Sequence, residues 1–478
     1  MDSVVKRRAI IAGSIALAVY IGWDIGQGSL ALAAIAAFSG LLLAVNIWAD
    51  ILPDALVGGA VLVGYLVGNR GFAQLSAPGI PLLPAEFALG MGLVCMVWRS
   101  ARARALFVRR DSLNVVLIIL ILAASIRLPL DVRRNGFMAL RDFATVYYAF
   151  FFFLAQDWSR HPASCRWIER CLSSGFALVA PAFEAFQLWP DTITKVTLNG
   201  NPLIFIKGDV ACGFMVAGVF WFLASYIRQP KPYRLLFAAI NLAGATLYNS
   251  RAAVVSLFFC VFCLLIFLII YRTGKLLRWF AVLAAFGVAA LVVEAFVPKE
   301  PGEKSLLYRS YESVLTIADV SGHYEPDVSS LDDKADNNRF RTIWWDAVIR
   351  ETREDGLWFG LGFGHDLAAQ FIQTYYPEDT DDFSVRSPHN VLITIFARMG
   401  VLGLGIMIVA LSSIAVRAWR DARLRPGHEP NAAWMGSMGI FVTACFGVVL
   451  EGPMGAVVFW TLLGLANSYT HRLQEPSP

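Results

Sequence analysis

Charged residues are scarce in this chain. Of its 478 residues, 57% are hydrophobic and only 16% are charged, whereas a soluble domain carries about 25% charged residues. A soluble multidomain protein is therefore disfavoured. A nucleic-acid-binding role is disfavoured as well, because the net charge is only +4 and the basic residues lie mostly in alternate short loops, where they act as topology signals.

Cysteine and metal-binding patterns are also sparse. The seven cysteines leave the stretch 298–389 without any, so no disulfide framework is expected there. Cys260 and Cys263 form a CxxC inside an apolar run, and we interpret them as two small apolar residues. No DxD pair is placed like a nucleotide-sugar metal site, and the adjacent aspartates at 332–333 and 381–382 are interpreted as solvated charge. We therefore expect no metal and no cofactor.

Apolar runs of roughly 15 to 22 residues, about the length that crosses a hydrocarbon core, dominate the chain. They predict an all-α polytopic membrane protein of about fourteen transmembrane helices. The first run follows Lys6, Arg7 and Arg8 without a small-residue cleavage site, so we interpret it as a retained helix. The predicted spans are 9–24, 29–48, 54–69, 82–98, 112–129, 142–156, 171–188, 209–227, 234–248, 252–271, 277–297, 390–416, 433–450 and 454–470.

The distribution of arginines predicts the topology. If the N-terminus is inside, Lys and Arg concentrate in the cytoplasmic loops near 6–8, 99–110, 160–170, 228–234, 272–278 and 417–425. This alternation fits the positive-inside rule and puts both termini in the cytoplasm. One large external loop then lies between spans 11 and 12. The expected division is a membrane domain over 1–297, the loop over 298–389, and the last three spans with a cytoplasmic tail over 390–478.

Several cations fall on the predicted external side, where the rule disfavours them. They indicate an anionic ligand on that side, although any single arginine could instead snorkel or pair with Asp142, Asp346, Glu351 or Glu354. The external cations are Arg127, Arg133, Arg134, Arg141, Lys207, Arg251, Arg339, Arg341, Arg350, Arg353 and Arg386.

The two halves of the external loop differ. Residues 299–338 are acidic and polar, which is typical of a partly mobile segment. Residues 340–348 repeat apolar side chains with helical spacing, and 367–376 form a second amphipathic stretch. We expect this second half to fold as a small helical cap on the membrane domain.

Four short motifs follow one another near the predicted outer face. Ser250-Arg251-Ala252 opens a span, Arg341 and Trp345 give an R-x-x-x-W spacing, glycines stand at 360, 362 and 364, and His389-Asn390 closes the loop. In this order the motifs resemble the O-antigen ligase and O-antigen polymerase superfamily of bacterial inner-membrane glycosyltransferases. The resemblance covers about Leu242 to Gly403, with Ala252 where glycine is commoner in the family.

The resemblance implies a GT-C-like architecture and a metal-independent enzyme of the bacterial inner membrane. The implied reaction moves a glycan from undecaprenyl diphosphate to an acceptor hydroxyl on the periplasmic side. The partners would be the lipid-linked donor, a lipid-anchored or growing glycan acceptor, and membrane lipid, but no nucleic acid.

The resemblance also implies roles for individual residues. His389 would be the base that accepts the acceptor's proton, since histidine titrates near neutral pH, and Asn390 would orient it. Arg251 and Arg341 would clamp the diphosphate, because a guanidinium binds phosphate oxygens bidentately. Arg339 and Arg141 are second choices for the clamp, and His323 and His365 are rivals to His389 that lie in no matching motif.

Three alternatives stay open at this stage. A polysaccharide polymerase shares the motifs with a ligase and differs only in its acceptor. A lipid-linked glycan flippase or transporter would be a non-enzyme and would need charged residues deep in the spans. A structural scaffold would leave the external arginines unexplained. The sequence does not identify the sugar, the acceptor, the oligomeric state or the role of two additional early spans.

Overall fold

The computed structural model describes residues 49–75, 83–104, 108–198, 200–247, 250–271, 281, 284–285, 308, 332–375, 386–425 and 431–474. Within these residues the fold is almost entirely helical, and its one sheet is a hairpin of two short antiparallel strands. The predicted spans 9–24, 29–48 and 277–297 and nearly all of 299–331 lie outside the described residues.

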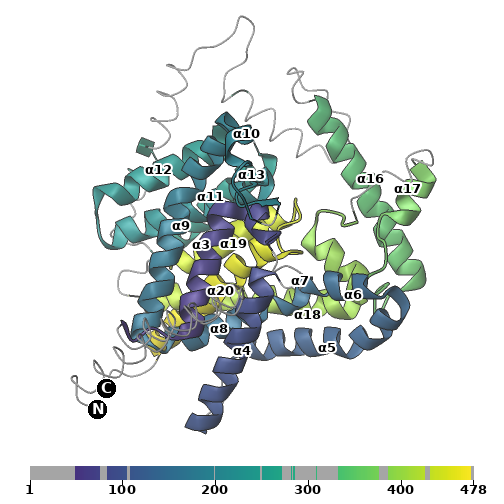
Figure 1. Ribbon diagram of the computed structural model, residues 1–478, viewed down its shortest axis with the longest axis horizontal. Coiled ribbons are helices and arrows are strands. Elements are labelled where there is room, and N and C mark those ends of the chain that lie inside the picture. The colour runs from purple at the N-terminus through teal and green to yellow at the C-terminus, as the bar shows by residue number, and fades with distance from the viewer. Residues whose placement is uncertain are drawn as a thin grey trace, which may run out of the picture.

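The first half of the chain builds six longer helices joined by short turns (Figure 1). Proline stands at the first helical position of several, where its missing N–H has no partner to lose. The elements are α3 (Pro53–Ala73), α4 (Pro84–Ala103), α5 (Ser112–Asn135), α6 (Phe137–Asp142), α7 (Ala144–Tyr147), α8 (Phe150–Ser159), α9 (Pro162–Leu188), α10 (Pro190–Ile193), β1 (Thr197–Leu198), β2 (Asn201–Pro202), α11 (Gly208–Arg228) and α12 (Pro232–Leu247).

The second half of the chain continues the bundle. It contains α13 (Arg251–Tyr271), α16 (Asp332–Asp355), α17 (Ala369–Tyr375), α18 (Val391–Leu424), α19 (Ala432–Ala444) and α20 (Pro453–Gln474). The side chain of Asn390 accepts hydrogen bonds from the first backbone N–H groups of α18, and Asn431 does the same for α19. These caps satisfy donors that a helix start leaves open.

Helix α11 is the centre of the bundle. It packs against α9, α12, α13 and α19, and 89% of its most apolar 18-residue window is buried. In contrast, α5 and α18 pack side by side with only 28% of theirs buried, and they run along the lower edge of Figure 1. A helix that is apolar on all sides yet exposed is typical of contact with lipid.

Five described helices are long and apolar enough to cross a membrane, or six if the bent pair Phe137–Tyr147 and Phe150–Ser159 counts as one span. The five are α3, α5, α9, α11 and α18. The described residues are therefore mostly helical, with helices of the length and composition found in membrane proteins. The total of fourteen spans and the inside or outside placement of each loop remain predictions.

Several predicted boundaries are corrected by the structure. The span predicted as 142–156 is broken into α7 and α8 by a 40° bend between α6–α7 and α8. The span predicted as 390–416 is two helical pieces, because Gly400 takes φ +66° inside α18. The span predicted as 433–450 ends at Ala444 and is followed by irregular chain over 445–452. Helix α16 begins at Asp332, inside the half of the loop that was predicted to be partly mobile.

Helices α16 and α17 form a separate small core on the outer part of α18. Trp344, Val348, Phe371 and Ile372 are buried together against Ala397 of α18. The Trp344 indole N–H donates a 2.8 Å hydrogen bond to the Leu367 carbonyl. Trp344 is therefore a packing residue that joins α16 and α17 to each other and to α18.

Loops that the arginine pattern assigns to one side lie at one end of the bundle. Arg109 donates to the Ser468 carbonyl, and Arg472 donates to the Ser159 carbonyl, so the 109, 159 and 468–472 regions meet. At the other end Arg127 donates to the Phe359 carbonyl.

Candidate active site

His389 lies at a strained point directly before α18. Its φ is +57°, in the left-handed region that few non-glycine residues adopt. Its backbone N–H donates to Ser387 Oγ over 3.4 Å. Its ring meets the edge of the Trp344 indole, with centroids 6.0 Å apart. Strain of this kind costs about 1–3 kcal/mol and is common at functional sites.

Positive charge surrounds the half-buried His389 ring. Burial, and then the cations of Arg341 and Lys207, lower the pKa of His389 from 6.5 to about 4, while the Asp209 carboxylate opposes this shift. Lys207 and Asp209 flank the start of α11, with Nζ and Oδ2 3.3 Å apart. The structure thus brings Arg341 to the same place as His389, although they are separated by almost fifty residues in the sequence.

Arg341 extends from α16 toward the irregular segment after α19. Its Nη1 donates a 2.7 Å hydrogen bond to the Phe446 carbonyl. Burial lowers the pKa of Arg341, and Asp209 opposes that effect. A β-carbon added at Gly447 would lie 3.1 Å from Asp209 Oδ2, so this segment also touches the start of α11. Four separate parts of the chain therefore meet around one cationic cluster, formed by Arg341 and Lys207 beside His389.

Arg251 opens α13, next to the same end of α11. The side chain of Ser250 interacts with Cys212 in the first turns of α11, and α11 packs against α13. The backbone at Arg251 is thereby placed beside the start of α11. The side chains of Arg251 and Arg339 lie outside what the structure describes, so the predicted three-way convergence with His389 remains a prediction.

The other predicted site residues are placed differently. Arg141 lies exposed on α6, where its Nη1 is 3.8 Å from the Met138 sulfur, and it is not among the charges that shift the pKa of His389. The Asn390 side-chain oxygen accepts from the N–H groups of Leu392 and Ile393. That oxygen orients the helix start rather than the His389 ring.

The glycine motif forms a turn that the end of α5 and Arg398 hold in place. Gly360, Gly362 and Gly364 all have positive φ, between +80° and +99°, which glycine adopts at little cost. Asp131 accepts from the Phe363 N–H over 2.9 Å. Arg398 donates to the Gly362 carbonyl over 3.1 Å. The motif is therefore a structural turn that joins the end of α5 to α18.

Arg398 itself is buried in α18 and carries the central ion pair of this scaffold. Its Nη2 lies 2.7 Å from Asp142 Oδ2, and the same carboxylate accepts from the Gly364 N–H. A β-carbon at Gly400 would lie 2.4 Å from the backbone of Trp358. The kink in α18 and the glycine turn therefore fit each other only without side chains at these positions.

His365, a rival for the base, is occupied elsewhere. Its Nε2 lies 2.7 Å from Glu351 Oε1, and its carbonyl accepts from Arg398. His323, the other rival, lies outside the described residues. Among the described histidines, His389 is therefore the one whose pKa the cations of Arg341 and Lys207 lower.

Sequence reasoning missed two residues of this region. Lys207 was noted as an external cation but was not assigned to the site, because nothing in the chain order connects it to the later motifs. Glu451 accepts a 2.9 Å hydrogen bond from Thr394 Oγ1 and interacts with Ser387, next to the His389 turn, and burial raises its pKa. The only sign of Glu451 in the sequence was its position as an acidic residue in the short break between two apolar runs.

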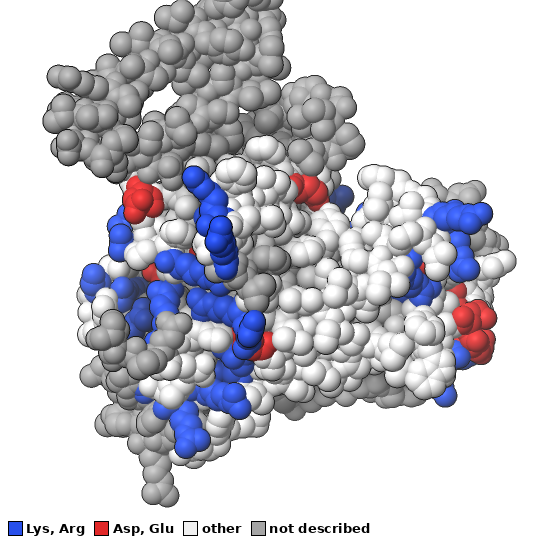
Figure 2. Space-filling model, turned by 90° about the horizontal axis from the view of Figure 1, so that it is seen from below, with Lys and Arg blue, Asp and Glu red and all other residues white. Residues whose placement is uncertain are grey.

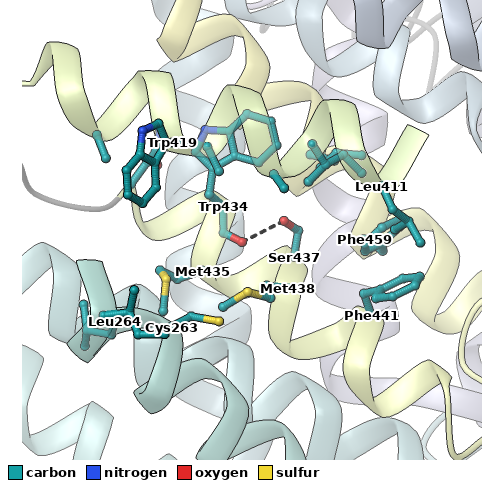
Figure 3. A pocket seen from close by; sticks show the side chains of 17 residues that line it. Cys263, Leu264, Leu411, Trp419, Trp434, Met435, Ser437, Met438, Phe441 and Phe459 are labelled. Atoms are coloured by element: carbon teal, nitrogen blue, oxygen red, sulfur yellow. Dashed lines mark hydrogen bonds between the residues drawn. The ribbon is translucent and has the colours of Figure 1, made fainter. Parts of the chain in front are cut away.

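An apolar cavity of about 340 Å³ lies elsewhere, between α13, α18, α19 and α20. Figure 3 shows aromatic, sulfur-containing and aliphatic side chains around it, with Ser437 bonded to the Trp434 carbonyl. Its α18 lining starts at Leu411, about 30 Å along the helix from His389. It has no charged lining residue, so it is not the predicted site.

Within the described parts of the chain, His, Cys, Asp and Glu side chains form no group of three or more that could hold a metal ion. The chemistry that these residues can support is proton transfer at His389 and binding of an anion by Arg341 and Lys207.

A known protein family matches the part of the chain that contains this site. Residues 235–408 match the family model described as O-antigen ligase. The matched stretch runs from α12 through α16 and α17 into the first part of α18, and it contains both Arg341 and His389. No curated protein matches the chain.

Proposed function

Because the chain belongs to the O-antigen ligase superfamily, we propose that it transfers a glycan from a polyprenyl diphosphate to an acceptor hydroxyl. Members of this family are glycosyltransferase-like enzymes, and the all-helical membrane fold suits a lipid-linked donor. Ligation to a lipid-anchored acceptor is the first choice, and polymerisation onto a growing glycan is the alternative. Undecaprenyl diphosphate is the proposed carrier.

The observation that carries this proposal is the position of His389 beside two cations. A base without nearby cations would not accommodate a diphosphate, and cations without a base would not accept a proton. Here Arg341 and Lys207 both act on the His389 ring. The cationic cluster and His389 together would therefore supply both groups that the reaction requires.

His389 would act as the general base. Because its pKa is lowered to about 4, the imidazole is neutral at physiological pH and has a free lone pair. The acceptor oxygen attacks the anomeric carbon of the donor and loses its proton to His389 as the new glycosidic bond forms. The bond to the diphosphate oxygen breaks, and its electron pair leaves with the diphosphate.

Arg341 and Lys207 would stabilise the departing diphosphate. Arg341 is held by the Phe446 carbonyl, which fixes its position without neutralising its charge. Negative charge that develops on the leaving oxygen would therefore meet a fixed guanidinium. Arg251 is the proposed second arginine of the clamp.

The donor would also tune its own base. The cations that lower the pKa of His389 would be offset by the negative charge of a bound diphosphate. The pKa of His389 would then rise toward its usual range, where a base is more effective. Proton abstraction would thus become favourable only when the donor is in place.

The proposal also includes the position of the protein and of its site relative to the membrane. We place the site on the periplasmic side of the bacterial inner membrane, with about fourteen GT-C-like spans and both termini in the cytoplasm. The loop over 298–389 would be the periplasmic unit between the membrane parts 1–297 and 390–478. Cationic side chains would replace a metal in binding the diphosphate.

A transfer assay with defined substrates tests the proposal. The full-length protein in detergent or nanodiscs is given a synthetic undecaprenyl-diphosphate glycan and either a lipid-anchored core sugar or a free repeat unit. His389→Ala should lower the rate by about 10²- to 10⁴-fold, as loss of a general base does. The control is His161→Ala, at a helix start where no side-chain cap bond is lost.

The two acceptors distinguish the two family reactions. Product on the core sugar alone supports a ligase, whereas elongated glycan supports a polymerase. Wild-type transfer by the His389→Ala protein would remove His389 as the base. Absence of transfer to either acceptor by a folded wild-type protein would contradict the proposed function.

A further inference from the structure

A cationic cavity lies at the end of the bundle opposite the candidate active site. It has a volume of about 590 Å³ and is lined by Arg109, Arg110, Arg160 and Arg472, together with His471. The arginines come from three parts of the chain: the approach to α5, the turn between α8 and α9, and the end of α20. Figure 2, which views the molecule from below, shows Lys and Arg concentrated at one end of that face.

The side chains that line the cavity are mostly basic. No acidic residue is among the described side chains that line it. Asp111, the nearest acid in the sequence, is already bonded to His471 at 2.7 Å and to Asn467 at 3.2 Å. Asp157 lies 3.9 Å from Arg160 but is also bonded to Arg99.

Two of the guanidinium groups are held by carbonyl oxygens. Arg109 Nη1 donates to the Ser468 carbonyl over 3.4 Å, and Arg472 Nη2 donates to the Ser159 carbonyl over 3.3 Å. The Arg472 guanidinium also lies over the Tyr469 ring at 5.1 Å. A carbonyl oxygen carries no net charge, so such a contact fixes the direction of an arginine without placing an anion beside it.

The position of the cavity relative to the bilayer indicates which kind of anion it could bind. Helix α5 starts at Ser112, beside the cavity, and its far end holds the glycine turn near the candidate active site. Its 24 residues span about 36 Å at 1.5 Å per residue. A bilayer core is about 30 Å thick, so the cavity lies at the level of phosphates in the leaflet away from the active site.

We propose that this cavity binds the phosphate of an anionic phospholipid, with Arg110 and Arg160 as the main contacts. Guanidinium groups bind phosphate oxygens bidentately, and basic cavities between membrane helices suit anionic headgroups. The site would fasten the approach to α5, the α8–α9 turn and the end of α20 to one lipid. It is independent of the transfer reaction.

Two other arginines at the same end supply a matched control. Arg102 and Arg104 are exposed at the end of α4, and Arg102 lies over the Trp98 ring at 5.9 Å. Neither lines the cavity. If positive charge near the membrane surface were the whole cause of lipid binding, removing this pair would weaken it as much as removing the cavity pair.

The test measures lipid binding to the purified full-length protein in a neutral detergent. Native mass spectrometry follows the binding of dioleoylphosphatidylglycerol, with dioleoylphosphatidylcholine as the neutral lipid. The double variant Arg110→Gln/Arg160→Gln should bind phosphatidylglycerol about 25-fold more weakly, at about fivefold for each arginine removed. Arg102→Gln/Arg104→Gln should change it by less than about threefold. If the double variant does not fold, the single variant Arg110→Gln is measured instead, and it should bind phosphatidylglycerol about fivefold more weakly.

Two outcomes would overturn the proposal. Equal weakening by the cavity pair and the control pair would mean that binding reflects surface charge alone. Displacement of the lipid by millimolar inorganic phosphate, with chloride at the same ionic strength having no effect, would identify a site for a soluble anion instead. Retention of phosphatidylglycerol under both salts would support a lipid headgroup.

Discussion

Replacing Arg341 with glutamine should raise the pKa of His389. In the folded protein that pKa is about 4 instead of 6.5, through burial first and then through the cations of Arg341 and Lys207. Removing a like charge at this range should raise it by about one pH unit. Burial and Lys207 remain, so the pKa should not return to 6.5.

Solution NMR of histidine-labelled protein measures this directly. The chain has six histidines, and His389→Gln assigns the resonance of interest. The control is Arg350→Gln, because Arg350 is an exposed partner of Asp346 further along the same helix. The control should leave the His389 midpoint near pH 4, whereas Arg341→Gln should move it to about pH 5.

The same shift has a consequence for stability. Between pH 6.5 and 4 the unfolded chain binds a proton at His389 that the folded protein does not bind, so stability falls as the pH falls through this window. The loss from this group approaches about 3 kcal/mol at 1.36 kcal/mol per pH unit. Arg341→Gln should reduce that loss to about 2 kcal/mol. Identical His389 midpoints in wild type and Arg341→Gln would refute the coupling on which the candidate site rests.

Three further predictions follow from the scaffold and from the proposed chemistry. Gly362→Ala should destabilise the protein by about 2–4 kcal/mol, because φ is +99° and the new β-carbon would lie 2.5 Å from Asp131 Oδ1; thermal unfolding measures it, and Gly90→Ala, which meets open space, should cost nothing. Arg398→Met should cost about 3–5 kcal/mol by leaving Asp142 unpaired, and adding Asp142→Asn should restore part of the lost melting temperature. EDTA should leave transfer activity intact, and loss with EDTA followed by recovery with magnesium would contradict clamping by arginine.

The helices were the part of the fold that the sequence predicted best. Apolar runs of membrane length correspond to α3, α5, α11, α13 and α18. In lipid such a run forms a helix because a helix satisfies its backbone hydrogen bonds internally. The failures are local. The bend between α7 and α8 and the early end of α19 depend on which groups satisfy the backbone there, and hydropathy does not report that.

The candidate site was predictable only as a set of residue types in order. The His389 and Arg341 motifs could be located, but the burial that lowers the His389 pKa, the Trp344 edge contact and the positive φ arise from tertiary packing. Lys207 reaches the site from a turn more than 130 residues before Arg341. No local pattern links the two.

The external cations illustrate most clearly the limit of prediction from sequence, because each of them could either bind an anionic ligand or pair with a carboxylate. Of these cations, Arg127 lies 3.0 Å from Asp131 and Arg350 is bonded to Asp346. The carboxylates largely neutralise the charge of these two arginines. Arg341 forms no salt bridge with any described residue, and its hydrogen bond goes to a carbonyl. Since a bound carboxylate removes most of an arginine's attraction for a second anion, the absence of such a partner distinguishes Arg341, for which we propose a role in binding the diphosphate, from the arginines that pair with carboxylates. That property belongs to the fold, because the competing carboxylates can be identified only when the helices that carry them are in place.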